Sequence, residues 1–363
     1  MSTRHPDVLI VGTYGGGGVH QYVEEQHRRL DDRLSVSSYD MRMPPSGSGV
    51  FWVMRAVLMG IWAAVKFPFR SRPDVVHVHT SYRFSFYRSS LYVLCARYIW
   101  RRPVVLHIHG SSFDDFVATD SSAVAKLQSL VFDASDRIIV LSEYWKDVVA
   151  TRADEDSITV LPNAVDPDNY QPTFDHDVPH LVFISNLIER KGVSELIAAI
   201  DELNRTTEIE FRVSIAGKGP LADQVVDFAD QYDDVTYHGY VSEAKKQSLL
   251  ENGSIYVLPT YAEGLPIAML EGMAGGNAIV STTVGSIPEV IGEDNGVLVP
   301  PGDVDELREG LRELLMSPDR VDRMGRVNYE TIQEEYSWEE VTEDLLRIYD
   351  TNRSHSAGSA ATA

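Results

Sequence analysis

The sequence predicts two doubly wound α/β domains. At 363 residues the chain is long enough for two hydrophobic cores. Short runs rich in Val and Ile alternate with segments of helical period, which is the pattern of parallel sheets covered by helices. The alternation stops at the Pro- and Asp-rich stretch 162–179 and then restarts. We therefore expect a hinge near 165–178, with a ligand between the domains at the carboxyl ends of the strands.

The individual elements follow from the same alternation. In the first half the expected strands are Val8–Val11, Val75–Val78, Val104–Ile108, Ile138–Leu141 and Ile158–Leu161. In the second half they are His180–Ser185, Phe211–Ala216, Val235–Tyr237, Ser254–Leu258, Ala278–Ser281 and Val297–Val299. Amphipathic helices are expected at Val193–Leu203, Leu221–Gln231, Glu243–Glu251 and Val304–Met316. The predicted domains span 1–170 and 171–336, and the small polar tail 354–363 is expected to be disordered.

Charge is unevenly distributed along the chain. The formal net charge is −22, and residues 1–170 hold 18 Lys and Arg against 19 Asp and Glu, whereas the remainder holds 14 against 35. Such an acidic surface suits solubility at high salt and indicates a halophilic source. It repels phosphates, so a nucleic-acid partner is not expected. Residues 42–102 are the exception, with ten Arg and Lys but one acid, Asp74.

The sequence favours a cytoplasmic protein. Met1–Pro6 runs directly into the strand-like DVLIVG, so no signal peptide is expected. The most hydrophobic stretch, Val50–Phe69, is interrupted by Arg55 and Lys66, whereas a spanning helix needs roughly twenty apolar residues. The single cysteine, Cys95, fits a reducing interior.

The densest chemical signal lies at 259–303, PTYAEGLPIAMLEGMAGGNAIVSTTVGSIPEVIGEDNGVLVPPGD. Glu263 ends a strand-to-helix loop, and Glu271 lies within the helix that follows. The start of this helix offers backbone N–H groups to an anion such as a diphosphate, from Gly264, Leu265 and Ile267. Glu271, about one turn deeper, can accept hydrogen bonds from the adjacent hydroxyls of a ribose. Glu263 can do the same for a sugar that is being transferred.

This segment resembles the signature of family 4 of the retaining glycosyltransferases (glycosyl transferases group 1). Two glutamates eight positions apart mean little in a chain with 54 acidic residues. The motif around this pair is specific for the family, because the glutamates lie within EGLPIAMLEGMAGG and are followed by GSIPEVI and GVLVPPGD. The resemblance implies the GT-B fold, two facing Rossmann-like domains with the active site in the cleft between them. It implies a hexosyltransferase-type enzyme (EC 2.4) that retains anomeric configuration and uses a nucleotide-diphosphate sugar, with no metal or other cofactor.

Further motifs extend the resemblance over most of the chain. SNLIERKGVSELIAAI (185–200) is similar to the family's basic loop, which implies that Lys191 binds the donor diphosphate. Asn186 stands where the family usually has arginine, and we expect Arg190 to compensate, since a guanidinium can bind phosphate oxygens bidentately. AGKGP (216–220) and HGYV (238–241) resemble donor-binding turns, which implies roles for Gly217 and Gly239 beside the nucleotide.

The first half carries weaker motifs. GTYGGGGVHQYVEEQ follows the first strand, and its glycines allow close approach to a ligand. It resembles the family's Gly-Gly turn, which implies that Gly17 and Gly18 face the donor phosphate. In LHIHGS, His109 matches the family histidine that reaches the donor sugar near the reacting carbon. LPNAVD (161–166) resembles the family's hinge, and YSWEEVTEDLLRIYD resembles the helix, about 337–353, that packs back on the first domain.

The strand histidines also raise the question of a metal. Alternation puts both histidines of HVHTS on one face, and likewise those of LHIHGS, so either pair can mimic metal spacing. No Cys/His cluster has ligand spacing on one element, so we expect no metal site. His77 and His107 are interpreted as half-buried, hydrogen-bonded imidazoles.

The family's mechanism assigns the catalytic roles to Lys191, Glu263 and His109. Lys191 stabilises the leaving diphosphate, while Glu263 and His109 position the sugar. The acceptor hydroxyl attacks from the face that the diphosphate leaves, and the leaving phosphate takes its proton. Glu263 is not assigned as a covalent nucleophile.

The acceptor side is indicated by residues 50–102, where aromatic residues mix with Arg and Lys. This mixture suits an anionic membrane surface and predicts peripheral attachment to the cytoplasmic face, with a glycan or polyprenyl-phosphate-linked acceptor. The alternative is that these aromatics form core and the arginines balance the acidic second domain. They are Phe51, Trp52, Trp62, Phe67, Phe69, Tyr82, Phe84, Phe86, Tyr87, Tyr98 and Trp100.

Two other functions remain open at this point. A sugar-nucleotide epimerase of the same architecture would bind the nucleotide and release product without an acceptor. A non-catalytic donor-binding scaffold is suggested only by Asn186 and Asn277, where the family often has arginine and proline, and both glutamates argue against it.

Overall fold

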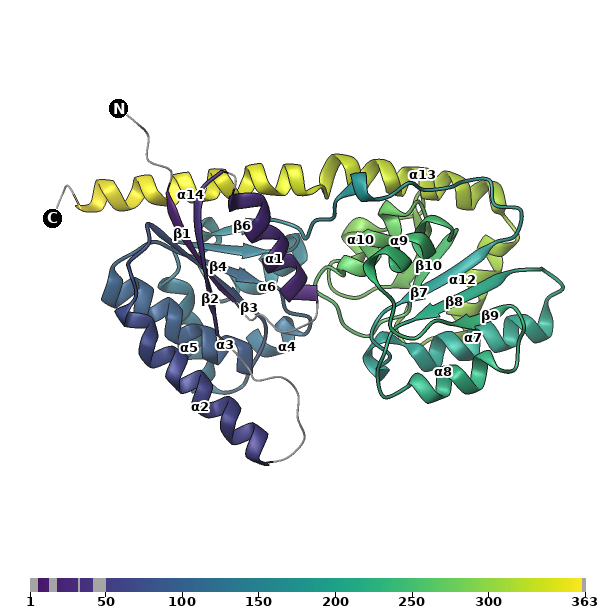
Figure 1. Ribbon diagram of the computed structural model, residues 1–363, viewed down its shortest axis with the longest axis horizontal. Helices are drawn as coiled ribbons and strands as arrows, with labels where there is room; N and C mark the ends of the chain where they lie inside the picture. The colour runs from purple at the N-terminus through teal and green to yellow at the C-terminus, as the bar shows by residue number, and fades with distance from the viewer. Residues whose placement is uncertain (1–5, 13–17, 32, 42–49, 361–363) are drawn as a thin grey trace. The chain divides into compact units, whose positions relative to one another are not determined.

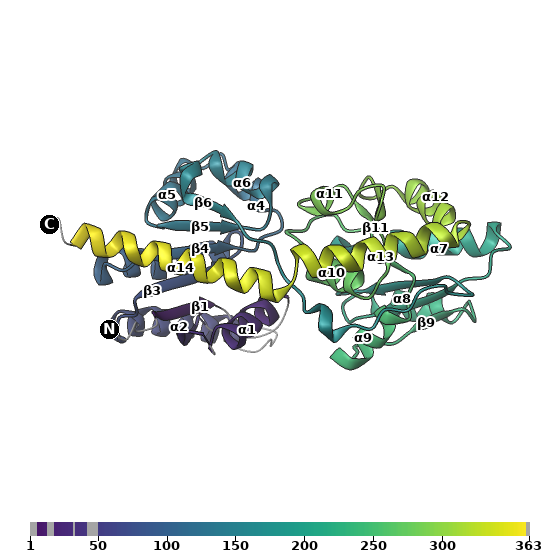
Figure 2. The same ribbon diagram turned by 90° about the horizontal axis from the view of Figure 1, so that it is seen from above.

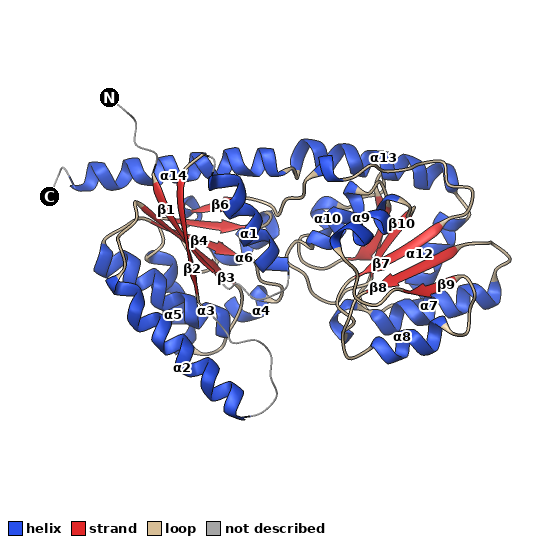
Figure 3. Cartoon of the chain, viewed as in Figure 1, coloured by secondary structure: helices blue, strands red, loops and turns tan. Residues whose placement is uncertain are grey.

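The chain forms two α/β units, each built on a parallel sheet. The computed structural model describes residues 6–12, 18–31, 33–41 and 50–360. Unit 1 comprises Met1–Pro162 with Glu339–Ala363, and unit 2 comprises Asn163–Trp338. In each unit, helices lie on both sides of the central strands (Figure 3). The predicted doubly wound architecture is therefore confirmed.

Unit 1 contains a six-stranded parallel sheet of order β2-β1-β3-β4-β5-β6. Its strands are β1 (Asp7–Gly12), β2 (Ser35–Asp40), β3 (Val75–Thr80), β4 (Val104–Ile108), β5 (Arg137–Val140) and β6 (Ile158–Val160). Its helices are α1 (Gly18–Asp31), α2 (Val50–Lys66), α3 (Phe84–Leu94), α4 (Phe113–Val117), α5 (Ser122–Asp133), α6 (Glu143–Ala150) and α14 (Trp338–Ala360), with short helical turns η1 (Phe67–Phe69), η2 (Cys95–Trp100) and η3 (Glu155–Ser157). β3 and β4 are buried along their whole length because helices cover both of their faces. α1 and α14 lie on one face of this sheet, and α3 and α5 lie on the other (Figure 1).

Unit 2 contains a second six-stranded parallel sheet, of order β12-β11-β10-β7-β8-β9. Its strands are β7 (His180–Ile184), β8 (Arg212–Ala216), β9 (Val235–Tyr237), β10 (Ile255–Leu258), β11 (Ala278–Thr282) and β12 (Gly296–Val299). Its helices are α7 (Val193–Thr206), α8 (Ala222–Ala229), α9 (Glu243–Glu251), α10 (Ile267–Ala274), α11 (Ile287–Val290), α12 (Val304–Leu315) and α13 (Pro318–Glu335), with short turns η4 (Pro167–Asn169) and η5 (Glu189–Lys191). α10 and α13 lie side by side (Figures 1 and 2).

The strand order of unit 2 reverses at β7. From β7 the chain adds β8 and β9 on one side of the sheet, then returns to add β10, β11 and β12 on the other. The loops that follow β7 and β10 therefore leave neighbouring strands towards helices on opposite faces. In doubly wound sheets ligands bind at the carboxyl ends of the strands at such a switch point. The two loops are 185–192 and 259–266.

The sequence predicted every strand except β2. β4, β9 and α9 have the predicted bounds, and the other predicted elements differ by a few residues at their ends. β2 has the sequence SVSSYD and is an edge strand, paired to β1 alone and partly exposed along its length. Its polar residues therefore give no hydrophobic run, which is the signal that the prediction used.

The first unit ends earlier than the predicted boundary at residue 170. The amide of Asn163 donates a hydrogen bond of 2.6 Å to the carbonyl oxygen of Leu265, and Val165 bridges to Ser337. These bonds join the start of the predicted hinge to unit 2.

α14 packs on unit 1 and extends further than expected. Arg33 of unit 1 forms a 2.6 Å ion pair with Glu343, and the amide of Gln26 donates to the hydroxyl of Tyr349 over 3.1 Å. The helix continues to Ala360, seven residues into the stretch 354–363, whose disorder stays a prediction. An anchored helix extends readily because each added residue gains one backbone hydrogen bond. Among the described residues, no helix is both long and apolar enough to span a bilayer.

Candidate active site

The centre of the candidate site is an ion pair between Lys191 and Glu263. The ammonium group of Lys191 contacts Oε1 of Glu263, and the two side chains are only 12 % and 8 % exposed. Lys191 ends η5, in the loop after β7, whereas Glu263 lies in the loop after β10. The two residues are 72 positions apart in the chain, and the switch point of the sheet brings them together.

Neighbouring loops hold Glu263 in place. The hydroxyl of buried Thr260 lies 3.0 Å from Oε1 of Glu263 and 3.0 Å from the carbonyl oxygen of Arg190. The hydroxyl of Thr282 donates to the carbonyl of Thr260 over 2.6 Å. Gly285 has φ +55°, and a Cβ there would lie 2.1 Å from the backbone oxygen of Glu263. The carboxylate is therefore preorganised by β10 and by the loop that follows β11.

Arg190 points towards the same carboxylate. Its Nη1 lies 3.9 Å from Oε2 of Glu263, and the guanidinium donates to the carbonyl of Ala262. Asn186, at the position where an arginine was expected from the family pattern, is exposed. The structure thus places a second cation beside Glu263, as the proposed compensation requires. Its contact with a phosphate stays a prediction.

The helix whose start was predicted to bind an anion is α10, which begins at Ile267, directly after Pro266. The N-terminal N–H groups of a helix can bind an anion, although here that of Met269 donates to the carbonyl of Pro266 over 3.0 Å. Anion binding at this helix start stays a prediction. Gly264 and Leu265 are buried in the preceding loop, next to Glu263 in the chain. The three predicted backbone positions therefore follow the ion pair directly.

Glu271 lies inside α10 and pairs with a lysine that the sequence analysis did not select. Nζ of Lys246, on α9, is 2.6 Å from Oε1 of Glu271 and 2.6 Å from Oε2 of Glu243. Burial raises the pKa of Glu271, and the ammonium of Lys246 opposes this rise. Burial also acts to lower the pKa of Lys246, but the carboxylates of Glu271 and Glu243 outweigh it and raise that pKa. Lys246 is therefore held as an ammonium ion.

The sequence did contain a signal for Lys246. In α9 the buried residues are Lys246, Leu249 and Leu250, at spacings that share one helical face. A lysine on an apolar face needs a buried partner, because burying an unpaired charge is costly. Thr260 carried no comparable signal.

Gly217 and Gly239 follow the next two strands of the sheet. Gly217 has φ +147°, and a Cβ there would lie 1.8 Å from the carbonyl oxygen of Ser185. Its backbone N–H donates to the carbonyl of Gly239 over 2.8 Å. Gly239 has φ +65° with open space around its Cα. Both glycines are thus at the carboxyl edge that carries Lys191, as predicted, and their contact with a donor stays a prediction.

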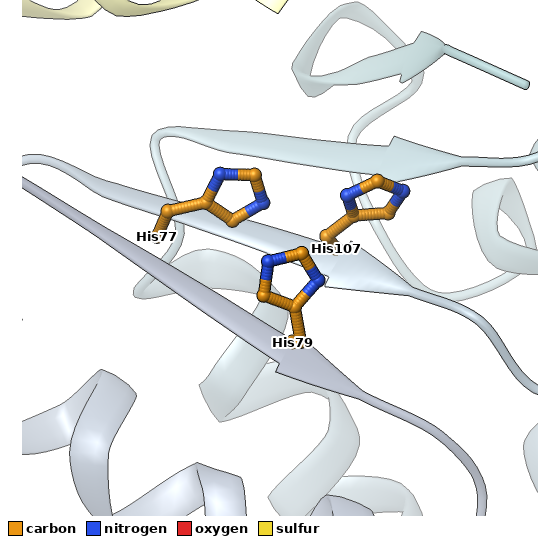
Figure 4. A group of neighbouring side chains, drawn as sticks. All are labelled: His77, His79 and His107. Atoms are coloured by element: carbon orange, nitrogen blue, oxygen red, sulfur yellow. The ribbon is translucent and has the colours of Figure 1, made fainter. Parts of the chain in front are cut away.

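In unit 1, His109 belongs to a buried cluster of histidines. Its Nε2 lies 2.8 Å from Nδ1 of His79, and its ring stacks on that of His107 with centroids 4.0 Å apart. His79 and His107 are paired across β3 and β4, and His77 lies on the same face of β3 (Figure 4). His79 therefore fixes the orientation of His109, a contact that the sequence analysis did not anticipate.

The side chains of His77 and His107 are fully buried, not half-buried as the sequence predicted. His77 is hydrogen-bonded, with Nδ1 2.6 Å from the hydroxyl of Tyr349, but neither ring nitrogen of His107 has a hydrogen-bond partner. Burial lowers the pKa of His77 to about 3 and lowers the pKa values of His79 and His107 well below the usual range, so the three imidazoles are neutral.

The glycine run lies mostly outside the described residues. Gly17 is among residues 13–17, which are not described, and Gly18 is the first residue of α1. Their predicted role at the donor phosphate stays a prediction.

We expect Gly192→Ala to destabilise unit 2. Gly192 follows Lys191 with φ +70°, and a Cβ there would lie 1.9 Å from the carbonyl oxygen of Pro259. Left-handed strain and this clash together should cost at least about 2 kcal/mol. The melting temperature should fall by about 4 °C or more in scanning calorimetry. Gly292→Ala is the matched control, since a Cβ there meets nothing within 4 Å. An equal and small effect of both substitutions would contradict the close packing of η5 on the loop after β10.

Comparison with known proteins identifies related sequences over both units. Residues 7–169 match the family described as Glycosyltransferase Family 4, and residues 178–317 match Glycosyl transferases group 1. The chain is 28 % identical over 264 residues to MMP alpha-(1->4)-mannosyltransferase of Mycolicibacterium hassiacum, covering 71 % of this chain and 61 % of that protein. It is 26 % identical over 376 aligned positions to alpha-maltose-1-phosphate synthase of Mycolicibacterium smegmatis, covering 93 % of this chain and 95 % of that protein. The match thus spans less than two thirds of the mannosyltransferase but nearly all of the synthase.

Solved structures resemble the chain over nearly its full length. Sucrose-phosphate synthase from Thermosynechococcus elongatus has a TM-score of 0.78 at 15 % identity and covers 95 % of this chain and 98 % of its own. Anabaena HepE in complex with UDP and glucose has a TM-score of 0.74 at 15 % identity, and the match covers 96 % of this chain and 100 % of HepE. At this identity the likeness shows the fold alone, and the predicted GT-B fold is confirmed.

Proposed function

We propose that this chain, which belongs to glycosyltransferase family 4, transfers a sugar with retention from a nucleotide-diphosphate sugar, and that Lys191, Glu263 and His109 perform the transfer. The bond between the anomeric carbon and the diphosphate oxygen breaks, and the acceptor hydroxyl forms the new bond on the same face of the sugar. The leaving phosphate accepts the hydroxyl proton. Lys191 stabilises the charge that develops on this phosphate.

The observation that carries this proposal is the Lys191–Glu263 ion pair at the switch point of unit 2. A nucleotide-diphosphate sugar has a negative diphosphate next to a sugar rich in hydroxyl groups. The ammonium group of Lys191 offers complementary charge to the diphosphate, and the neighbouring carboxylate of Glu263 offers hydrogen-bond acceptors to the sugar hydroxyls. Glu271, in α10, supplies a second carboxylate for the ribose.

We propose UDP as the donor nucleotide to test first. Solved structures of HepE contain UDP, UDP with glucose, or UDP-glucose, and that protein shares the fold of this chain. Thermal stabilisation by UDP-, GDP- and ADP-sugars ranks the candidates, because a ligand that binds the native state raises its melting temperature.

The proposed reaction needs no metal at the diphosphate. Lys191 and Arg190 place two cationic side chains beside Glu263, and α10 adds its positive N-terminal dipole. We expect added Mg²⁺ or Mn²⁺ to leave the transfer rate unchanged in a coupled assay of nucleoside diphosphate release. A strict requirement for either ion would contradict this part of the proposal.

An acceptor assay separates the proposed transferase from its alternatives. The anomeric configuration of the glycoside formed from the preferred donor, read by proton NMR, should equal that of the donor. An epimerase would instead convert the donor without an acceptor. A scaffold would bind the donor but give the same negligible turnover in the wild type and in Glu263→Ala.

We propose further that the acceptor is linked to a lipid and that unit 1 attaches peripherally to the cytoplasmic face of an anionic membrane. Five apolar side chains of α2 are 55–63 % exposed: Met54, Leu58, Ile61, Trp62 and Val65. They follow spacings of 4, 3, 1 and 3 residues, which places them within one face of the helix. We call this face the α2 stripe. A polyprenyl-phosphate-linked glycan is the acceptor class that suits such attachment.

Charge favours a bilayer as the partner of the α2 stripe. Arg55 and Lys66 lie along one edge of the stripe, and exposed Phe69 and Arg70 follow the helix directly. This basic, apolar surface belongs to a protein of net charge −22, so it is the region suited to anionic headgroups. Other aromatics of 50–102 are instead core residues, namely Phe67, Phe86 and Trp100. The side chains of Phe51 and Trp52 lie outside the described residues.

We expect Leu58→Glu to lower the partition coefficient on anionic liposomes about 10-fold, because a charge replaces a side chain that enters the membrane interface. Flotation on phosphatidylglycerol vesicles at moderate salt measures this. Leu130→Glu is the matched control, an exposed leucine of α5 in the same unit. Failure of the wild type to bind these vesicles, or equal loss in both variants, would contradict attachment through the α2 stripe.

A further inference from the structure

The core of unit 1 contains imidazole nitrogens that lack hydrogen-bond partners. His77, His79 and His107 are 0 %, 2 % and 0 % exposed. Nε2 of His77, Nε2 of His79 and both ring nitrogens of His107 are buried without a partner. An unpaired buried polar atom destabilises the folded protein, so a core that keeps several of them together is unusual. A ligand that pairs these nitrogens at once would remove this cost.

The three residues come from neighbouring strands. His77 and His79 alternate along β3, so both face α1 and α14, and His107 of β4 is the register partner of His79. One ring nitrogen from each of the three residues lies within 4.8 Å of those of the other two (Figure 4). No single strand or helix carries a set of histidines or cysteines at the spacing of metal ligands, and for this reason no metal site was predicted from the sequence. The pairing of β3 with β4 supplies the third histidine.

In His77 and His79 the opposite ring nitrogen is fixed by a hydrogen bond, whereas His107 has no such support. Nδ1 of His77 lies 2.6 Å from the hydroxyl of Tyr349, and Nδ1 of His79 lies 2.8 Å from Nε2 of His109. Metal-binding histidines have this arrangement, in which one nitrogen is held by a second residue and the other is left for the ion. The imidazoles are also in the neutral form that binds metals.

We propose that His77, His79 and His107 bind a divalent transition-metal ion, preferentially Zn²⁺, with water as the fourth ligand. Three neutral imidazoles are an established ligand set for Zn²⁺. In a tetrahedral site with Zn–N bonds of about 2.1 Å, two ligand nitrogens lie about 3.4 Å apart. The rings, now within 33° of parallel, must therefore rotate so that their nitrogens converge by roughly 1 Å.

The ion would be structural. It joins β3 to β4, and through the hydroxyl of Tyr349 it connects both strands to α14. None of its three ligands is among the residues proposed to bind the donor diphosphate. His79 does contact His109, but metal binding is measured without turnover, so its failure is distinguishable from failure of the proposed transfer reaction.

Cobalt titration of the full chain, after removal of metals by a chelator, tests this site. We expect one equivalent of Co²⁺ to give the visible absorption bands of a tetrahedral site, and one equivalent of Zn²⁺ to abolish them and raise the melting temperature. His107→Gln should weaken Co²⁺ binding at least about 100-fold, and Tyr349→Phe about 10-fold through the lost support of His77. His180→Gln is the control, because His180 is a buried histidine of unit 2 whose two ring nitrogens are already hydrogen-bonded.

His107→Cys provides a test that does not depend on the folding of His107→Gln. A thiolate at position 107 should retain Co²⁺ and add a sulfur-to-cobalt charge-transfer band in the near ultraviolet, absent from the wild type. The proposal is overturned if the wild type gives no tetrahedral cobalt bands, if His180→Gln loses them equally, or if His107→Cys lacks the charge-transfer band.

Discussion

Lys191→Ala is expected to lower kcat about 10²- to 10³-fold, the usual effect of removing one group that stabilises developing charge in the transition state. The ammonium group is the least exposed cation at Glu263, and it occupies the switch point of the unit 2 sheet. Initial rates with saturating donor and acceptor measure the change. KM for the donor should also rise, since the same ammonium binds the ground-state diphosphate.

The control for this experiment is Lys245→Ala, which removes an exposed lysine of the same unit. Loss of Lys191 also leaves Glu263 without its closest cation, so the melting temperature of the variant must be recorded with its rate. A folded Lys191→Ala protein with nearly wild-type kcat would remove this residue from the mechanism.

Glu271→Ala is expected to raise KM for the donor about 10- to 100-fold, with a much smaller change in kcat. A carboxylate that accepts from ribose hydroxyls contributes hydrogen bonds of about 1.5–3 kcal/mol each, and it contributes them equally before and during the reaction. Glu271 is held in α10 with Lys246 against one of its oxygens, so its position is defined before the donor binds. Donor titration at saturating acceptor separates KM from kcat.

Glu243→Ala is the matched control for Glu271. Glu243 also contacts Lys246, at 2.6 Å, but its side chain is largely exposed at the start of α9. If Glu271 acted only through its ion pair with Lys246, Glu271→Ala and Glu243→Ala would raise KM for the donor equally. A change in kcat with unaltered KM in Glu271→Ala would also contradict a role in ribose binding.

The fold was predictable because both sheets are buried on both faces. β3, β4, β7 and β11 are buried throughout and therefore read as apolar runs. β2 was missed because an edge strand carries no such run. The boundary at Pro162 depends on the bonds of Asn163 and Val165 to residues more than a hundred positions later, which local patterns cannot show.

Part of the candidate site was also predictable, since Glu263, Glu271 and Lys191 belong to sequence motifs. The sequence could not show which residues pair with them, because partners such as Lys246 and Thr260 are brought close by strand order. Asn277, where the family often has proline, could not be interpreted from the sequence. It is buried and its amide donates 2.8 Å hydrogen bonds to the carbonyls of Leu250 and Gly272. Its role is to fasten the end of α10.

A crystal structure of the full chain with its most stabilising nucleotide sugar would show how the donor binds. We expect the Lys191 ammonium within hydrogen-bond distance of a diphosphate oxygen, with Glu271 accepting from the ribose hydroxyls and Glu263 from the sugar. A diphosphate bound away from the loops that follow β7 and β10, with the Lys191–Glu263 pair undisturbed, would contradict this expectation.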